Sequence, residues 1–166
     1  MGNAGPACVK PLDFPPFFRD TAPVLLAYLR RLGATQSLAE DVAQDAFAAL
    51  VATGGLHWAR DHARAFMYRV ATNGYVDACR RQRREVGWDA VPDAPDQSPG
   101  PQSEGLDAMP AWHRLSARQR QLLWLAYAEG FTHAEIASIC RLGERSVRVL
   151  LFRARAAFKA ATEEAS

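Results

Sequence analysis

The chain has 166 residues, of which 49% are apolar, enough for one ordinary domain or two small ones with packed interiors. The longest uninterrupted apolar run, residues 122–128, is far shorter than the roughly 20 residues that span a bilayer, and no charged-then-apolar leader opens the sequence. The cysteines, Cys8, Cys79 and Cys140, are widely separated and form no Cys-x-x-Cys pair, which argues against a disulfide framework or a zinc site. We therefore expect a soluble, cytoplasmic protein.

The net charge of +2 conceals three segments of different charge. Residues 1–84 carry 11 basic and 7 acidic side chains, residues 85–109 carry 6 acidic and no basic ones, and residues 110–166 carry 9 basic and 5 acidic ones. Two basic modules therefore flank an acidic segment, which is a charge pattern compatible with a polyanionic partner.

Two helices are predicted before residue 55. The first covers residues 17–32, where apolar side chains recur at helical spacing and Gly33 follows as a stop signal. The second opens at a capping box, Ser37 to Glu40, and buries Leu38, Val42, Ala46 and Leu50. Its outward face presents Asp41, Gln44 and Asp45. From the residues alone, this acidic face is predicted only to be exposed to solvent.

A third long helix is predicted from about Asp61 to Arg84. Its buried side is expected to consist of Ala63, Phe66, Met67, Val70, Ala71, Gly74 and Ala78, with Gly74 allowing a close helix approach. The other side carries Tyr68, Thr72, Asn73, Tyr75 and Val76, and the helix ends in Arg80, Arg81, Arg83 and Arg84. Arginines neutralise phosphates, aromatic rings stack on unpaired bases and an amide reads a base edge, so this helix is predicted to bind single-stranded or distorted DNA.

Residues 85–110 are rich in proline, glycine and acidic side chains and lack apolar periodicity. They predict a flexible, acidic linker. The chain is thus expected to be all-α, with two small helical domains, residues 1–84 and 111–166, joined by this linker.

The C-terminal domain contains a predicted helix-turn-helix. Thr132 and Glu135 form a capping box that opens a helix from about His133 to Cys140, and residues 141–143 supply a short turn with a glycine free to adopt a positive φ. A second helix follows from about Glu144.

One face of this last helix is apolar and the opposite face is basic. The apolar stripe consists of Val147, Leu150, Leu151, Ala154 and Phe158. The other face carries Arg145, Arg148, Val149 and Phe152, with Ser146, Arg153 and Arg155 at its margins; of these, the candidate DNA-binding residues are Arg145, Ser146, Arg148, Phe152 and Arg153. Arginine binds guanine edges or phosphates bidentately, and apolar side chains contact thymine methyl groups, so we predict that this helix lies in a DNA groove.

Three segments in this order resemble the extracytoplasmic-function group of bacterial sigma factors. Residues 39–47 resemble the helix that binds the polymerase clamp, residues 63–84 the helix that reads and melts the minus-ten element, and residues 115–158 the domain that reads the minus-thirty-five element. The resemblance implies a non-catalytic subunit without metal or cofactor. Its implied partners are promoter DNA, an anti-sigma factor and core RNA polymerase, the last through the β′ clamp and the β flap.

The resemblance also implies roles for individual residues. Asp41, Gln44 and Asp45 fall where the family docks on the β′ coiled coil; Asn73, Asp77 and Arg80 fall where it contacts the minus-ten element; and Thr132 belongs to the DNA-reading helix-turn-helix. Four residues depart from the family pattern, namely Arg141 in the turn, Thr72 in the melting helix, and Val149 and Leu150 in the last helix. The segment 54–60 before the melting helix is short, and Trp58 there is predicted either to help capture a flipped base or to seal the domain core.

Two other hypotheses remain open from the residues. A helix-turn-helix regulator would bind duplex operators without polymerase, but its sensor domain would not need the aromatic, amide and arginine residues of the third helix. A helical adaptor would bind only protein, and its retention on nonspecific DNA would not depend on salt. No histidine, cysteine or glycine-loop pattern of an enzyme is present.

Overall fold

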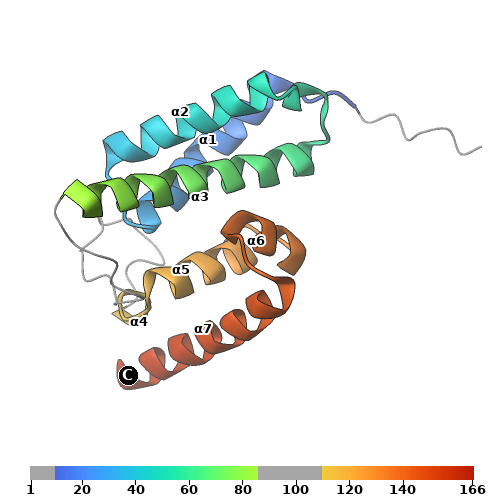
Figure 1. Cartoon of the computed structure of the whole chain (residues 1–166). Coiled ribbons are helices and arrows are strands. Elements are labelled where there is room, and N and C mark those ends of the chain that lie inside the picture. The colour runs from blue at the N-terminus through green and yellow to red at the C-terminus, as the bar shows by residue number, and fades with distance from the viewer. Residues whose placement is uncertain (1–9, 86–109) are drawn as a thin grey trace, which may run out of the picture.

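The computed structural model describes residues 10–85 and 110–166, and in these ranges every regular element is helical, which confirms the all-α prediction (Figure 1). The N-terminal domain contains α1 (Phe14–Arg31), α2 (Gln36–Ala52), the 3-10 turn η1 (Gly55–His57) and α3 (Arg60–Glu85). The C-terminal domain contains α4 (Pro110–His113), α5 (Ala117–Leu123), one turn of π-helix η3 (Trp124–Ala128), α6 (His133–Cys140) and α7 (Glu144–Glu164). The predicted linker lies outside the described residues from 86 to 109.

The three long helices of the N-terminal domain pack around a common apolar core. From α2, Val42, Ala46 and Leu50 are buried as predicted, whereas Leu38 is only half-buried. The predicted capping box at Ser37 is wrong, because the helix starts earlier and Thr35 Oγ1 accepts the Leu38 amide at 3.2 Å. Threonine and serine both cap helices, and the two candidates are only two residues apart.

Two glycines of this domain differ in their surroundings. A Cβ on Gly55 would lie 2.9 Å from the carbonyl oxygen of Leu50, so this turn has no room for a side chain. A Cβ on Gly74 would meet the Val42 side chain at 3.4 Å, which is ordinary van der Waals contact. Gly74 thus faces α2, where it was expected to allow a close helix approach, and an alanine would fit at the same position.

The C-terminal domain contains the predicted helix-turn-helix. Thr132 and Glu135 form the capping box, with Thr132 Oγ1 accepting the Glu135 amide at 3.2 Å and Glu135 Oε2 accepting the Thr132 amide at 2.8 Å. The turn differs from the expectation, because Arg141 adopts the left-handed conformation at φ 54° while Gly143 has φ −73° and precedes α7. Arg141 thus tolerates a conformation that glycine adopts without strain.

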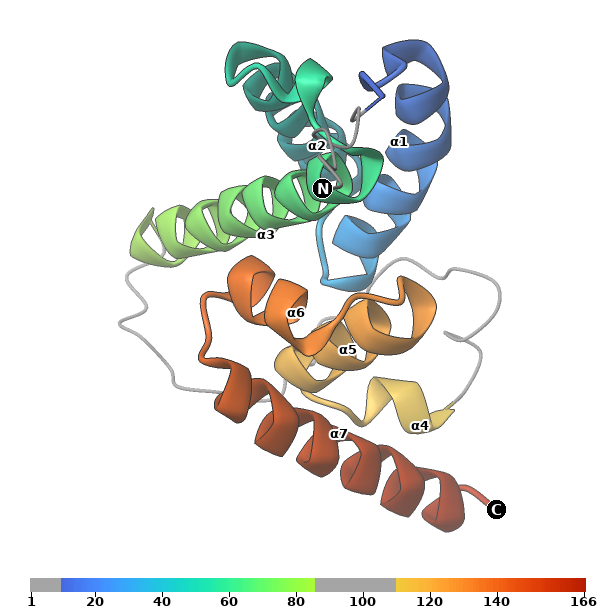
Figure 2. The same ribbon diagram turned by 90° about the vertical axis from the view of Figure 1, so that its right-hand side faces the viewer.

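The helices form layers that can be followed in two views. The N-terminal helices α1, α2 and α3 lie on one side, α5 and α6 lie beneath α3, and α7 lies on the far side of α5 and α6 (Figures 1 and 2). The buried apolar residues of both domains form one continuous cluster. No described helix is both long enough and apolar enough to cross a membrane.

Candidate nucleic-acid interface

The exposed face of α7 carries the residues predicted to meet duplex DNA. Val147, Leu151 and Ala154 are buried on the opposite face, which fixes the rotation of the helix. Phe152 is 66% exposed and Val149 is 49% exposed, both large values for apolar side chains. The predicted polar and charged positions are all exposed as well: Arg145, Ser146, Arg148 and Arg153. This face therefore combines guanidinium groups with apolar surface that no other described element covers.

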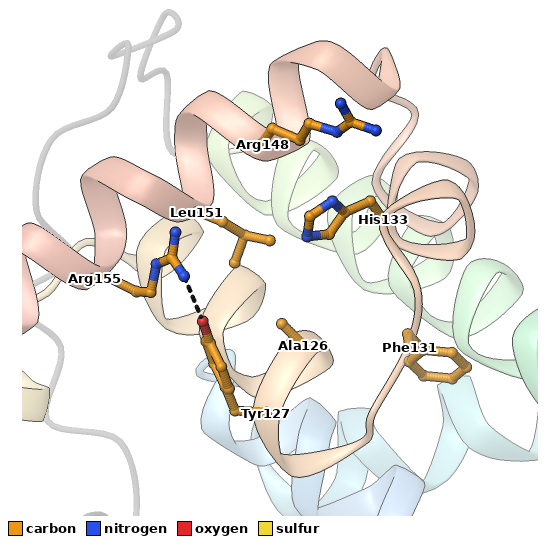
Figure 3. A pocket seen from close by; sticks show the side chains of 7 residues that line it. All are labelled: Ala126, Tyr127, Phe131, His133, Arg148, Leu151 and Arg155. Atoms are coloured by element: carbon orange, nitrogen blue, oxygen red, sulfur yellow. Dashed lines mark hydrogen bonds between the residues drawn. The ribbon is translucent and has the colours of Figure 1, made fainter.

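Arg148 extends from this face beside a hollow of about 360 Å³ between η3, the start of α6 and α7 (Figure 3). Arg155 lies further along α7, and its Nη1 donates to the Tyr127 hydroxyl at 3.1 Å. His133 completes the polar rim. The hollow is thus a basic recess next to the predicted recognition face. The sequence analysis placed Arg155 at the margin of the basic face, although its spacing of seven residues from Arg148 puts both on the same side of the helix. Tyr127 was not singled out from the sequence.

Thr132 stands at the start of α6 beside this recess. It is exposed, but its hydroxyl oxygen already accepts the Glu135 amide in the capping box. The hydroxyl group can still rotate about the Cβ–Oγ bond, so Thr132 can donate a hydrogen bond to an acceptor such as a phosphate oxygen.

The helix α3 has three faces rather than the two that were predicted. Ala63, Met67 and Ala71 are buried in the domain core, as expected. Tyr68 and Thr72, predicted to face outward, are 0% and 3% exposed because they lie under the C-terminal domain and beside α1. Burial raises the pKa of Tyr68 above its ordinary value, and the nearby Glu129 carboxylate adds to this effect.

Tyr75 is likewise held by the protein. It is half-buried, and its hydroxyl donates to the Leu32 carbonyl oxygen at 2.7 Å. Neither Tyr68 nor Tyr75 therefore offers a free ring to a base in this arrangement. The prediction that these two rings of α3 stack on unpaired bases is wrong.

A different set of aromatic side chains lies at the start of α3, where His62 is exposed and Trp58 and Phe66 are half-buried against the domain core. Trp58 stacks on His62 with ring centroids 4.6 Å apart and an interplanar angle of 24°, and it meets Phe66 edge-on at 5.1 Å. The Arg69 guanidinium lies 5.4 Å from the Phe66 ring centroid. His62, Phe66, Arg69 and Asn73 follow one another at offsets of four, three and four, so they share one helix face. Helical periodicity assigned Phe66 to the core, and Phe66 does pack against it while remaining half-buried. Of these aromatic residues the sequence singled out only Trp58 as a candidate for base capture, and Trp58 also packs against the core.

The remaining predicted positions of α3 continue this exposed face or flank its end. Asn73 is half-buried, while Asp77, Arg80, Arg81 and Arg83 are exposed. The side chain of Arg84 lies outside the described residues. An amide, a carboxylate and several guanidinium groups thus follow the His62 and Phe66 rings along α3.

The acidic positions of α2 form a separate surface. Asp41, Gln44 and Asp45 are exposed, and they point away from the buried Val42 and Ala46. In Figures 1 and 2 the helix α2 lies at the opposite end of the molecule from α7. The acidic surface and the α7 surface are therefore able to meet different partners.

The cysteines do not indicate a reactive or metal-binding site among the described residues. Burial raises the pKa of the Cys140 thiol to about 11, so the thiol is protonated at neutral pH. Within residues 10–85 and 110–166, no three histidine, cysteine or carboxylate side chains are grouped in a way that would hold a metal ion.

Comparisons with known proteins match both domains. Residues 17–85 match the model of sigma-70 region 2 and residues 111–158 match that of sigma-70 region 4, so the two matches together cover 117 of the 166 residues. A search of curated protein sequences finds no match. Among solved structures, the fold is similar to the sigma factor RpoE in complex with the anti-sigma factor NepR from Bartonella quintana, with a TM-score of 0.68 and 24% identity. That similarity covers 91% of this chain and 97% of the other.

Proposed function

The chain belongs to the sigma-70 family, in its extracytoplasmic-function group, and acts with core RNA polymerase and promoter DNA in transcription initiation; from this premise we propose how its surfaces divide that work. Region 2 corresponds to the N-terminal domain and region 4 to the C-terminal domain.

The exposed face of α7 reads the minus-thirty-five element in the major groove. Arg145, Arg148 and Arg153 supply guanidinium groups for base edges or phosphates, and Phe152 supplies apolar contact to a thymine methyl group. Ser146 and Thr132 donate to phosphates at the edge of the groove. The 66% exposure of Phe152 is the observation that carries this assignment, because a large apolar ring on an otherwise basic face indicates a surface that becomes covered.

The exposed face of α3 binds the opened minus-ten element. Asn73 and Asp77 contact unpaired bases, and the arginines from Arg80 to Arg84 neutralise the strand that leaves the site. The Trp58 and His62 stack lies at the other end of the same face and supplies aromatic surface to a base.

The acidic face of α2 docks on the polymerase β′ clamp through Asp41, Gln44 and Asp45, and the C-terminal domain contacts the β flap. The protein is a regulatory subunit and not an enzyme, and it works in the cytoplasm, where polymerase transcribes DNA. An anti-sigma factor is a further proposed partner, because the structurally similar RpoE was solved in complex with one.

In vitro transcription tests the proposal. Purified chain and core polymerase are incubated with a library of randomised promoters, and the transcripts are sequenced. We expect initiation from templates that share two short elements, and none from core polymerase alone. Binding of the chain to duplex DNA without any effect on initiation by core polymerase would instead identify an operator-binding regulator.

A further inference from the structure

The basic recess between η3, the start of α6 and α7 has an apolar floor beneath a charged rim. Leu151 and Phe131 in its lining are 3% and 6% exposed. Arg148, Arg155 and His133 form the rim. Sites for small molecules combine apolar walls with a few polar groups in this way, and the volume of about 360 Å³ is within their usual range.

The rim attracts negative charge and offers hydrogen-bond donors. Arg148 and Arg155 are permanently charged, and the His133 imidazole has an N–H donor whether or not it is protonated. Glu144 Oε1 lies 3.4 Å from Arg148 Nη2, but both side chains are more than half exposed, so water screens this pair. Among the described residues, none of the seven that line the recess is acidic. The recess is therefore suited to an anion.

The two ends of the recess differ in their chemistry (Figure 3). Arg148 and His133 lie at one end, and Arg155 and Tyr127 lie at the other. Arg148 and Arg155 are seven residues apart, so their backbone positions are separated by about 10 Å along α7. Arg155 Nη1 is directed to the Tyr127 hydroxyl, 3.1 Å away. A single phosphate at the Arg148 end would therefore leave the Tyr127 end empty.

Tyr127 supplies a surface for an aromatic ring. Its side chain is 62% exposed, and it comes from η3, outside the recognition helix α7. The hydrogen bond to Arg155 holds both side chains at the recess, which lowers the entropy lost when a ligand binds. Aromatic rings stack on nucleobases, and arginine donates to base edges. This end therefore fits a nucleobase, and the opposite end fits a phosphate.

We propose that the basic recess binds a nucleotide, with its phosphates at Arg148 and His133 and its base on the Tyr127 ring beside Arg155. The consequence for transcription rests on the proposed function, in which Arg148 also reads duplex DNA. One guanidinium cannot serve both ligands, so a bound nucleotide competes with the upstream promoter element. The nucleotide concentration then regulates how much of the chain is ready for a promoter.

Titration calorimetry of the full chain tests the site without polymerase or DNA. The probes are ADP in magnesium-free buffer and its two parts, adenosine and inorganic phosphate. We expect ADP to bind at least about tenfold more tightly than either part, because only ADP reaches both ends of the recess. Tyr127→Ala is expected to weaken ADP binding about five- to hundredfold and to leave phosphate binding unchanged, because it removes only the stacking surface.

A matched pair of variants separates the recess from the general charge of α7. Arg155→Ala removes a cation from the recess, and Lys159→Ala removes an exposed cation one turn further along the helix, outside the lining. Weaker ADP binding is expected for Arg155→Ala alone. No saturable binding of ADP up to about 1 mM, or equal losses for Arg155→Ala and Lys159→Ala, would overturn the proposed nucleotide site.

Mobility shifts on upstream-element duplexes test the competition. At ten times its own Kd, ADP is expected to raise the apparent Kd of the parent chain for the duplex about tenfold. The same ADP concentration is expected to have little effect on Tyr127→Ala. If Tyr127→Ala weakened duplex binding while the parent bound no ADP, the recess would take only DNA phosphates and the proposal would be overturned. ADP binding by a chain that directs no initiation in the promoter-library assay would instead contradict the proposed function and leave the nucleotide site in place.

Discussion

Arg148 and Asn73 are exposed or half-exposed on different domains, so single substitutions separate their roles. Arg148→Ala is expected to weaken binding to the duplex upstream element by ~1–3 kcal/mol if the guanidinium makes a bidentate base contact. Lys159→Ala removes the same charge from the far end of α7 and serves as the control. Electrophoretic mobility shifts on upstream-element duplexes measure the difference. Equal losses for the two variants would point to a general charge effect instead of base reading.

Asn73→Ala is expected to impair strand opening while binding to the upstream element remains intact. The amide lies on the same face of α3 as His62 and Phe66, where an unpaired base has both a hydrogen-bonding group and aromatic surface within reach. Permanganate footprinting of unpaired thymines measures opening. Gln82→Ala, which removes another exposed amide from the same helix, is the control. Normal footprints for Asn73→Ala would remove this residue from the melting site.

At the residue scale, exposure was predictable where helical periodicity within a single domain decides it. The α7 face is an example, since Val147, Leu151 and Ala154 are buried and Arg148 is not. Tyr68 was predicted to be free because its helix position lies away from the domain core. Its burial depends on Phe131, far along the chain in the other domain, and no local pattern carries that information.

Helix α3 should tolerate alanine at one glycine, whereas the preceding turn should not tolerate it at another. Gly74→Ala is expected to stabilise the chain by ~0.5–1 kcal/mol, because the new Cβ meets Val42 at ordinary distance and the unfolded chain loses freedom. Gly55→Ala is expected to destabilise it by ~1–3 kcal/mol, because the Cβ would lie 2.9 Å from a backbone oxygen. Urea unfolding followed by circular dichroism measures both. A destabilising Gly74→Ala would mean that α2 and α3 approach more closely than described.

Helix α2 offers a test of polymerase docking. The double variant Asp41→Arg with Asp45→Arg is expected to reduce co-purification with core polymerase and to leave helicity unchanged, because both carboxylates are exposed and away from the core. The control reverses two exposed carboxylates at the other end of the chain, Glu163→Arg with Glu164→Arg, and makes the same change in net charge. Undiminished co-purification of the α2 variant would assign docking to another surface.

At the element scale, the sequence predicted helix type and approximate bounds well. The helix predicted from about Asp61 to Arg84 is α3 at Arg60–Glu85, and the Thr132 capping box starts α6 at His133. The wrong predictions concern helix ends at which two neighbouring residues could fill the same structural role. Thr35 caps α2 in place of Ser37, and Arg141 adopts the positive φ that was expected of a glycine. These choices depend on where the chain must leave the previous helix, which tertiary packing decides.

At the scale of the whole molecule, the packing between domains predicts how a cut chain behaves. Proteolysis is expected to cut first between residues 85 and 110, as the composition of that segment indicates. The two fragments are then expected to co-elute in size-exclusion chromatography at micromolar concentration, because Arg64, Tyr28 and Tyr68 still have their partners across the interface. Separate elution of two folded fragments from the parent chain would show that the contacts need the covalent connection.

Two domains and their likeness to a known family were predictable, but their packing against each other was not. The separation of basic and acidic segments and the Pro-rich stretch between them indicate the domain boundary in the sequence. The cross-domain contacts come from isolated residues such as Gln121 and Glu129, which look like ordinary surface positions on their own helices.

The π-helical turn η3 bears on how this part of the C-terminal domain tolerates the loss of a residue. Its Glu129 amide bonds to the Trp124 carbonyl oxygen at 3.1 Å, five residues back, so this turn holds one residue more than an α-helical turn would. Because the extra residue is absorbed within the π turn, loss of one residue here would restore an ordinary α-helical turn and leave the elements beyond it in nearly the same orientation. A single in-frame deletion at this turn is thus expected to be tolerated without a change in how α7 presents its DNA-reading residues.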